Sequence, residues 1–224
     1  MAISYLVPIV LGLLPSFAWI VFFLREDKDH PEPKKLIFYT FIVGAASSFL
    51  VLPFQIFINE RLIAVGTPIY GATSLFLLAA VEEIFKFAVV YWAISKRREF
   101  DEPLDAMIYM IIAALGFAAV ENVASLFQVI GNLETVALRF IGATLLHSLA
   151  SGLVGFYWAK AMLKKRSFAS NIIWGLLLAT VLHAIFNYLI INTGPVGFSI
   201  VFLVFIAYFL LNDFEVIKQA EAKQ

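Results

Sequence analysis

Seven stretches of this chain are each apolar enough over about twenty residues to cross a bilayer as a helix. They cover residues 3–24, 36–58, 70–95, 104–126, 136–159, 172–191 and 196–211. Because the chain has 224 residues, seven such spans leave only about ten residues for each tail or connector. The sequence therefore predicts an all-α, polytopic membrane bundle that forms one domain over residues 1–224, with no room for a folded soluble domain.

The basic residues are distributed unevenly among the connectors. Thirteen of the 16 Lys and Arg residues lie in segments 25–35, 96–103 and 160–171 and in the C-terminal tail, whereas the alternate connectors contain only Arg61 and Arg139. Cytoplasmic loops are enriched in Lys and Arg. We therefore expect the N-terminus outside and the C-terminus in the cytoplasm. The first span has no basic residue before it, so we expect it to be retained, unlike a signal peptide.

Net charge and cysteine content exclude several functions. The formal net charge is zero, so no basic surface for nucleic acid is predicted. The chain contains no cysteine, which excludes disulfides, thiolate catalysis and thiolate metal sites. Function must then be sought among the polar side chains inside the spans.

Six ionisable residues lie well inside the predicted spans, and Asp105 and Arg139 lie near span ends. An ionised group in the bilayer interior costs at least about 2.5–3.5 kcal/mol, so such groups are expected to face one another. The six are Glu82, Glu83, Lys86, Glu121, His147 and His183. We therefore predict that they converge on one polar pocket.

The segment EEIFK places two carboxylates within reach of one lysine. Glu82 and Lys86 are four residues apart, and Glu83 and Lys86 are three apart, so either pair can form on one helix. One carboxylate is then neutralised and the other is free to act as a general base. Which of the two is free stays open, and a purely structural ion-pair network is the alternative.

Two of the three histidines lie near the middle of separate spans. Asn187 follows His183 by four residues, so both lie on one helix face. A histidine and an amide on one face can donate two hydrogen bonds to an oxyanion. Counting residues from the span ends, at a rise of about 1.5 Å each, predicts a wet pocket that opens toward the extracytoplasmic side.

Five sequence blocks, in order, resemble the PrsW family of membrane-embedded peptidases. They are DKDHPEP at 27–33, EEIFK at 82–86, the stretch 104–122 that ends in Glu121 and Asn122, Arg139 eight residues before His147, and LHAIFN ending at Asn187. The resemblance covers about residues 25–190 and leaves out the last span. CAAX prenyl endopeptidases and bacterial abortive-infection proteins are more distant relatives.

The resemblance implies hydrolysis of a peptide bond of a membrane-anchored protein in a cell membrane. Glu82 would activate water together with His147, while His183 and Asn187 would hold the oxyanion. Glu83 belongs to the same essential set, and the supporting residues would be Lys86, Glu121, Asn122 and Arg139. Bacterial members are associated with the first cut of a membrane-anchored anti-sigma factor during envelope stress. The CAAX relatives carry an arginine one position further along than Lys86, which leaves the roles of Glu82 and Glu83 exchangeable.

Three other interpretations stay open at this stage. No cofactor is favoured, but a zinc peptidase could use His147, His183 and Glu82 as ligands, although the sequence contains no HExxH motif. Buried carboxylates and histidines also form proton relays in transporters and channels. A non-catalytic membrane protein that keeps a peptidase fold is the third interpretation.

Overall fold

The computed structural model describes residues 2–28, 30–128, 133–164, 167–193 and 196–223, and its described residues form seven α-helices without a β-strand. The helices are α1 (Ala2–Phe23), α2 (Lys34–Ala64), α3 (Ala72–Ile94), α4 (Pro103–Gln128), α5 (Leu133–Lys164), α6 (Phe168–Asn192) and α7 (Val196–Glu221). The predicted all-α class is confirmed.

Local signals mark several helix boundaries. Pro33 is the N-cap of α2, and Pro103 is the first residue of α4, where its missing N–H costs nothing. The Ser167 side chain caps α6 by accepting the backbone N–H of Ser170. Gly66 has a φ of 74° in the connector after α2, a conformation that glycine adopts without strain.

Five helices are long and apolar enough to cross a membrane, namely α1, α2, α4, α6 and α7. The other two, α3 and α5, carry Glu82, Glu83, Lys86 and His147. The structure thus supports a membrane protein with several spans.

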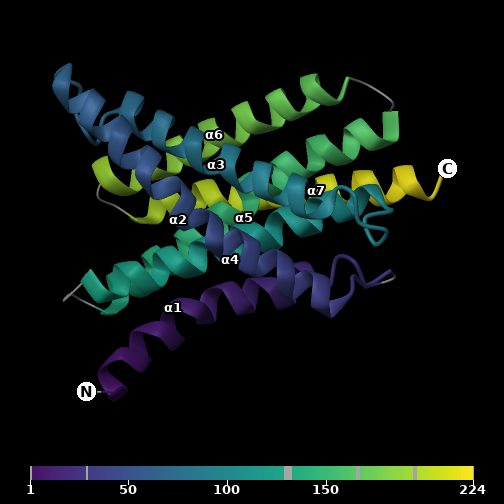
Figure 1. Ribbon diagram of the computed structural model, residues 1–224, viewed down its shortest axis with the longest axis horizontal. Helices are drawn as coiled ribbons and strands as arrows, with labels where there is room; N and C mark the ends of the chain where they lie inside the picture. The colour runs from purple at the N-terminus through teal and green to yellow at the C-terminus, as the bar shows by residue number, and fades with distance from the viewer. Residues whose placement is uncertain (1, 29, 129–132, 165–166, 194–195, 224) are drawn as a thin grey trace.

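The bundle is organised around α4. Of its apolar window, 89% is buried inside the protein, compared with 17–39% for the other four apolar helices. It packs against α1, α2 and α5 and lies among them in Figure 1. A helix that is apolar on all sides suits such a central position.

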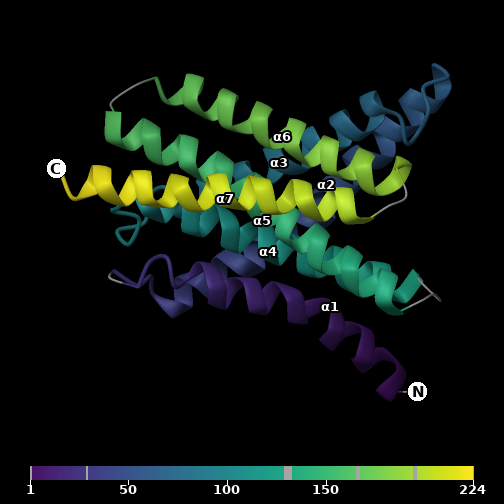
Figure 2. The same cartoon turned by 180° about the vertical axis from the view of Figure 1, so that it is seen from behind.

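Glycines let the backbone of α2 touch that of α4. A Cβ atom at Gly44 would lie 2.0 Å from the carbonyl oxygen of Ala113, and one at Gly116 would lie 2.0 Å from that of Phe41. Beyond this crossing, the α2–α3 hairpin diverges from the ends of α4 and α5, as Figures 1 and 2 both show.

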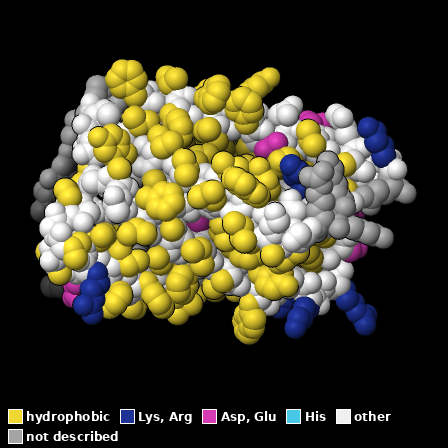
Figure 3. All heavy atoms as spheres, turned by 90° about the horizontal axis from the view of Figure 1, so that it is seen from above, with side chains coloured by type: hydrophobic (Ala, Val, Ile, Leu, Met, Phe, Trp, Pro, Cys, Tyr) yellow, Lys and Arg dark blue, Asp and Glu magenta, His cyan; other side chains and the backbone are white. Residues whose placement is uncertain are grey.

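The two ends of the bundle differ in their number of Lys and Arg residues. The connectors 24–33 and 95–102 and the end of α7 lie at one end, here called the basic end, whereas the 65–71 connector lies at the opposite end (Figure 1). The two chain termini also lie at opposite ends (Figures 1 and 2). Figure 3 shows a broad hydrophobic surface between the two ends, with the visible Lys and Arg side chains gathered at the ends.

We expect Gly44→Ala to destabilise the protein, because a Cβ atom at this position overlaps backbone that cannot rotate away. Overpacking of this kind costs about 1–3 kcal/mol. Thermal unfolding of the purified protein in detergent measures the effect. Gly142→Ala is the matched control, since its Cβ would be 3.4 Å from the nearest atom. Equal melting temperatures for the two variants would contradict the close α2–α4 contact.

Candidate active site

Five ionisable side chains from three helices meet in the interior of the bundle. Their exposed fractions are 6% or less. Glu82, Glu83 and Lys86 come from α3, His147 from α5 and His183 from α6. The sixth residue of the predicted set, Glu121 on α4, lies at the edge of this group, and its side chain is 39% exposed.

Glu83 is fully engaged by three donors. Its Oε1 lies 2.8 Å from Lys86 Nζ and 2.9 Å from His183 Nδ1. Its Oε2 accepts the hydroxyl of Ser151 on α5 at 2.9 Å. Both oxygens are thereby used, and the negative charge is balanced by the lysine, so Glu83 is the paired member of the two glutamates.

Glu82 keeps one free oxygen. Gln55 on α2 donates to its Oε1 at 2.8 Å. Its buried Oε2 has no hydrogen-bond partner among the described residues and lies 3.7 Å from both Lys86 Nζ and His183 Nε2. A buried oxygen without a partner is costly. This oxygen is therefore available to a ligand.

The hydrogen bonds assign the protons of both histidines. An ammonium can only donate, so His147 Nδ1 accepts from Lys86 at 2.8 Å and Nε2–H faces the Glu121 carboxylate at 2.8 Å. The Glu83 carboxylate can only accept, so His183 carries its hydrogen on Nδ1. Neutral His183 therefore presents a lone pair on Nε2 toward the free oxygen of Glu82.

The tautomer of His183 limits the hydrogen bonds that the predicted pair of His183 and Asn187 can donate to an oxyanion. His183 Nε2 can donate to an oxyanion only when the ring carries a second proton. Asn187 lies one turn further along α6, half-buried, and its side chain makes no hydrogen bond within the described part of the chain. The two residues share a helix, as expected, but only Asn187 offers donors in the neutral state.

The predicted supporting residues divide into three groups. Lys86 and Glu121 contact the central side chains directly. Asn122 donates instead to Thr144 Oγ1 at 2.7 Å and to the carbonyl of Gly12 at 3.4 Å, so it ties α4 to α5 and α1. The side chain of Arg139 lies outside the described residues.

The structure adds three residues that sequence reasoning missed. Gln55 and Ser151 bind Glu82 and Glu83, and the ring centroid of Phe117 lies 4.4 Å from Lys86 Nζ. Ser151 follows His147 by four residues, so its place on the same helix face was visible in the sequence. Gln55 is a polar residue within an apolar span. The same signal identified the six ionisable residues in the sequence.

The side chains present suit a metal ion. Glu82, His147 and His183 each offer a ligand atom, and these atoms lie within 4.8 Å of one another. Two imidazoles and one carboxylate form a common catalytic zinc set. The second ring nitrogen of each histidine faces a carboxylate, from Glu83 and Glu121, as in many metal centres. Metal binding at His147 Nδ1 would, however, displace the Lys86 ammonium.

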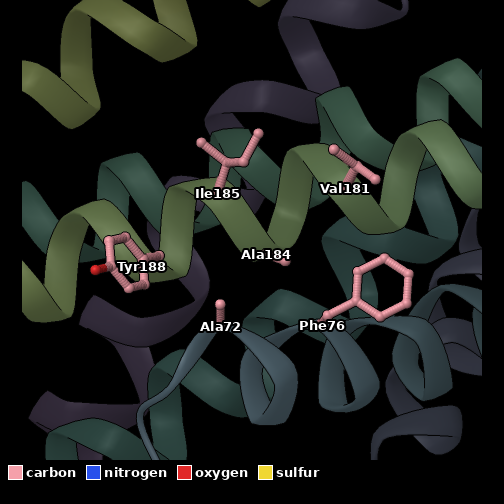
Figure 4. Close-up of a pocket in the computed structure, with 6 residues that line it drawn as sticks. All are labelled: Ala72, Phe76, Val181, Ala184, Ile185 and Tyr188. Atoms are coloured by element: carbon pink, nitrogen blue, oxygen red, sulfur yellow. The ribbon is translucent and has the colours of Figure 1, made fainter.

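An apolar cavity of about 320 Å³ lies between α3 and α6 (Figure 4). These helices also carry Glu82 and His183. The cavity is lined by Ala72, Phe76, Val181, Ala184, Ile185 and Tyr188. The cavity can accept an apolar group beside these two helices.

We expect Lys86→Met to lower stability strongly, because Glu83 would lose its countercharge while remaining buried. Removing one partner of a buried ion pair costs about 3–5 kcal/mol. Membrane accumulation and thermal unfolding in detergent measure the loss. The double variant Glu83→Gln/Lys86→Met should recover more than half of it, and exposed Lys35→Met serves as the control. A double variant no better than the single one would contradict the pairing of Glu83 with Lys86.

Comparisons with known proteins identify the family. A family profile described as "PrsW family intramembrane metalloprotease" matches residues 32–211. A protein named Protease PrsW from Geobacillus kaustophilus is 34% identical over 191 residues, which cover 84% of this chain and 81% of that protein. Protease PrsW from Oceanobacillus iheyensis is 30% identical over 184 residues, 80% of each chain, and that from Bacillus subtilis is 23% identical over 205 residues, 90% of this chain and 91% of its own.

No solved structure matches the chain. The matched range extends past the sequence blocks quoted above, into α7, and contains all the side chains of the site described here. Because the profile covers most of the sequence, this chain belongs to the PrsW family.

Proposed function

We propose that this chain is an intramembrane endopeptidase that hydrolyses a peptide bond of a membrane-anchored protein with a water molecule activated at Glu82. One observation carries the proposal. The free Oε2 of Glu82 and the lone pair on His183 Nε2 are two buried acceptors only 3.7 Å apart. Two acceptors repel unless a donor lies between them, and a water molecule can donate to both.

The surrounding groups prepare Glu82 to act as a general base. Gln55 holds its Oε1, so that Oε2 faces His183. Glu83 fixes the tautomer of His183 and forms an ion pair with Lys86. The water oxygen attacks the carbonyl carbon of the substrate while Glu82 takes a proton, which it then delivers to the leaving amine as the C–N bond breaks.

The negative charge of the tetrahedral intermediate also requires stabilisation. The Asn187 amide, which has no hydrogen-bond partner among the described residues, can donate to the oxyanion, in agreement with the family resemblance. The Lys86 ammonium lies 3.7 Å from Glu82 Oε2, so it adds a positive charge beside the reaction. His147 lies between Lys86 and Glu121 and provides a polar link from the interior to the exposed edge of the site.

A zinc-dependent peptidase is the second candidate, supported by the mutual distances of Glu82, His147 and His183. These three residues would hold the ion, which when bound would supply a Lewis acid and lower the pKa of a bound water. Glu83 and Glu121 would then orient the histidine rings. The description of the family as metalloproteases also supports this candidate.

We further propose that all seven helices cross the plasma membrane as a single domain over residues 1–224, with the basic end in the cytoplasm. The concentration of Lys and Arg at that end supports this orientation. Partly exposed Glu121 and the divergence of the α2–α3 hairpin lie toward the opposite end. The substrate, an anti-sigma factor in the case implied by the family resemblance, would then be cut from the extracytoplasmic side.

We expect Glu82→Gln, Glu83→Gln, His147→Ala and His183→Ala each to abolish cleavage of a coexpressed, tagged single-span membrane substrate. All four should still be found in the membrane, with Glu83→Gln in smaller amounts because it leaves buried Lys86 without its countercharge. Loss of general acid–base catalysis alone lowers a rate by about 10²–10⁴-fold. Immunoblotting of the tagged fragment measures cleavage. The control is Glu60→Gln, the same change from glutamate to glutamine at an exposed position near the end of α2, and this variant should cleave normally. Normal cleavage by all four variants would remove the peptidase proposal.

Cleavage by the purified protein, with and without a strong chelator, distinguishes the glutamate mechanism from the zinc mechanism. We expect cleavage to survive a strong chelator, because both ring nitrogens of His147 already have partners in Lys86 and Glu121. Metal content by mass spectrometry gives an independent reading. One zinc per chain, together with loss of cleavage on chelation and recovery with zinc, would replace the glutamate mechanism with the zinc mechanism.

We expect a reporter fused after Gln224 to be active on the cytoplasmic side, because the basic end includes the end of α7. A reporter inserted in the 65–71 connector should be active on the extracytoplasmic side. Two reporter enzymes are used at both positions, one that is active only in the cytoplasm and one that is active only outside it. The reverse pattern would invert the proposed orientation without affecting the chemistry of the site.

A further inference from the structure

Three nitrogen atoms surround the free oxygen of Glu82, and their hydrogen bonds determine what each can offer to a substrate. Lys86 Nζ and His183 Nε2 both lie 3.7 Å from Glu82 Oε2, and His147 Nδ1 lies 4.0 Å from it. All three distances exceed that of a hydrogen bond. A group that binds at Glu82 Oε2 therefore meets three nitrogens whose remaining donors and acceptors can be counted.

Neither histidine has a hydrogen to donate at this place. His147 accepts from Lys86 on Nδ1 at 2.8 Å, and its Nε2–H faces Glu121 at 2.8 Å, so both of its nitrogens are in use. His183 carries its hydrogen on Nδ1, which lies 2.9 Å from Glu83, and its Nε2 keeps a lone pair. Of the two rings, His183 offers one acceptor and neither offers a donor.

Lys86 has one hydrogen that no hydrogen bond uses. An ammonium carries three hydrogens, and within the described part of the chain Lys86 donates two of them, to Glu83 Oε1 and His147 Nδ1, each at 2.8 Å. Its side chain has no exposed surface. The ring of Phe117 lies 4.4 Å from Nζ, but an N–H contact with an aromatic face is weak. A buried donor without a full partner is costly, so the third hydrogen is available to a ligand oxygen.

We propose that Lys86 is the catalytic residue that donates a hydrogen bond to the oxyanion, and that His147 and Glu121 are positioning residues that direct this hydrogen. This role rests on the glutamate mechanism proposed above. It replaces the role that the family resemblance implies for His147, which is to activate water together with Glu82.

The reaction balances with water and the substrate alone. The water oxygen forms a bond to the carbonyl carbon while Glu82 takes one of its protons, and the π electrons of the C=O bond move onto the carbonyl oxygen. This oxyanion accepts the third hydrogen of Lys86 without receiving the proton. When the C=O bond re-forms, the C–N bond breaks, and the proton on Glu82 passes to the leaving nitrogen. Glu82 ends as a carboxylate, and the products are a carboxylic acid and an amine.

His147 and Glu121 restrict the direction of this hydrogen. Three directions at the ammonium nitrogen are occupied, by the lysine side chain itself, by Glu83 and by His147, so tetrahedral geometry fixes the fourth. The ring of His147 is held in turn by Glu121 through its other nitrogen. The side chain of Glu121 is 39% exposed, so it can be changed without leaving a buried charge alone.

A phosphinic peptide distinguishes the oxyanion donor from the general base. The probe is a fluorescent phosphinic analogue of the bond that the purified full chain cuts in the tagged single-span substrate, and its P–O⁻ oxygen imitates the oxyanion. Ligands that resemble the transition state lose affinity when an interaction of the transition state is removed. The kcat and KM for the substrate and the Kd of the probe are measured in nanodiscs. A wild type that cuts no substrate would overturn the proposed function itself, and this assignment with it.

We expect Lys86→Met to lower kcat by about 10²–10³-fold, the usual cost of removing one oxyanion donor, and to weaken probe binding by a similar factor. The KM should change by less than about threefold, because the lost interaction is made only in the transition state. Glu82→Gln should lose cleavage but bind the probe at least as tightly as the wild type, since it removes the base and keeps the donor. Exposed Lys35→Met is the control.

Glu121→Ala tests the positioning role, and it decides the assignment where Lys86→Met fails to accumulate. Its kcat and its affinity for the probe should both fall by about tenfold, because the ring of His147 is no longer held. Glu121→Gln should recover most of both values, since its amide oxygen still accepts the Nε2–H of His147. Exposed Glu60→Ala is the control and should match the wild type.

Three results would overturn the role of Lys86. One is probe binding at the wild-type value in both Lys86→Met and Glu121→Ala while kcat falls, because residues that only support the fold do not select the tetrahedral state. Another is an equal loss of probe binding in Glu82→Gln. The third is release of the probe from the wild type by a strong chelator, which would mean that a metal ion holds the oxyanion.

Discussion

The buried carboxylate of Glu83 is the interaction on which the candidate active site depends. It receives donors from three helices, namely Lys86 on α3, Ser151 on α5 and His183 on α6. An ionised group at this depth is tolerable only when it is paired and hydrogen-bonded. By using these donors, Glu83 fixes the lysine and the tautomer of His183, and it leaves the neighbouring Glu82 with a free oxygen. The two adjacent glutamates therefore differ because of their partners.

The backbone arrangement leaves the edge of the site at Glu121 partly exposed. Gly44 and Gly116 bring α2 and α4 into contact, and past that point the α2–α3 hairpin moves away from α4 and α5. Gln55 lies on the diverging half of α2 and still reaches Glu82. Glu121 lies on the diverging half of α4 and is partly exposed. Through its contact with His147, Glu121 connects the buried side chains of the site to the surface.

Much of this arrangement could be predicted from the sequence, because long apolar runs determine where helices form and because the cost of isolated charges in a bilayer requires them to meet. The ends of the helices were less predictable. The structure extends α7 to Glu221, ten residues beyond the predicted 211, because its last turns are polar and hydropathy does not register them. The choice between Glu82 and Glu83 was also out of reach, since spacings of three and four residues both permit a pair with Lys86. In the structure Lys86 lies 2.8 Å from Glu83 and 3.7 Å from Glu82. The proton positions on His147 and His183 depend on the same contacts, so the limited donor capacity of His183 could not be read from its spacing to Asn187.

One electrostatic rule explains both buried polar groups in this protein, although they satisfy it differently. In the candidate active site a lysine on the same helix supplies the countercharge through its direct contact with Glu83. At the basic end, buried Glu32 accepts the hydroxyl of Tyr109, and buried Asp105 accepts the backbone N–H groups of Asp101 and Glu102. A lysine is therefore present where two adjacent glutamates share one buried site, whereas uncharged donors hold the carboxylates near the connectors.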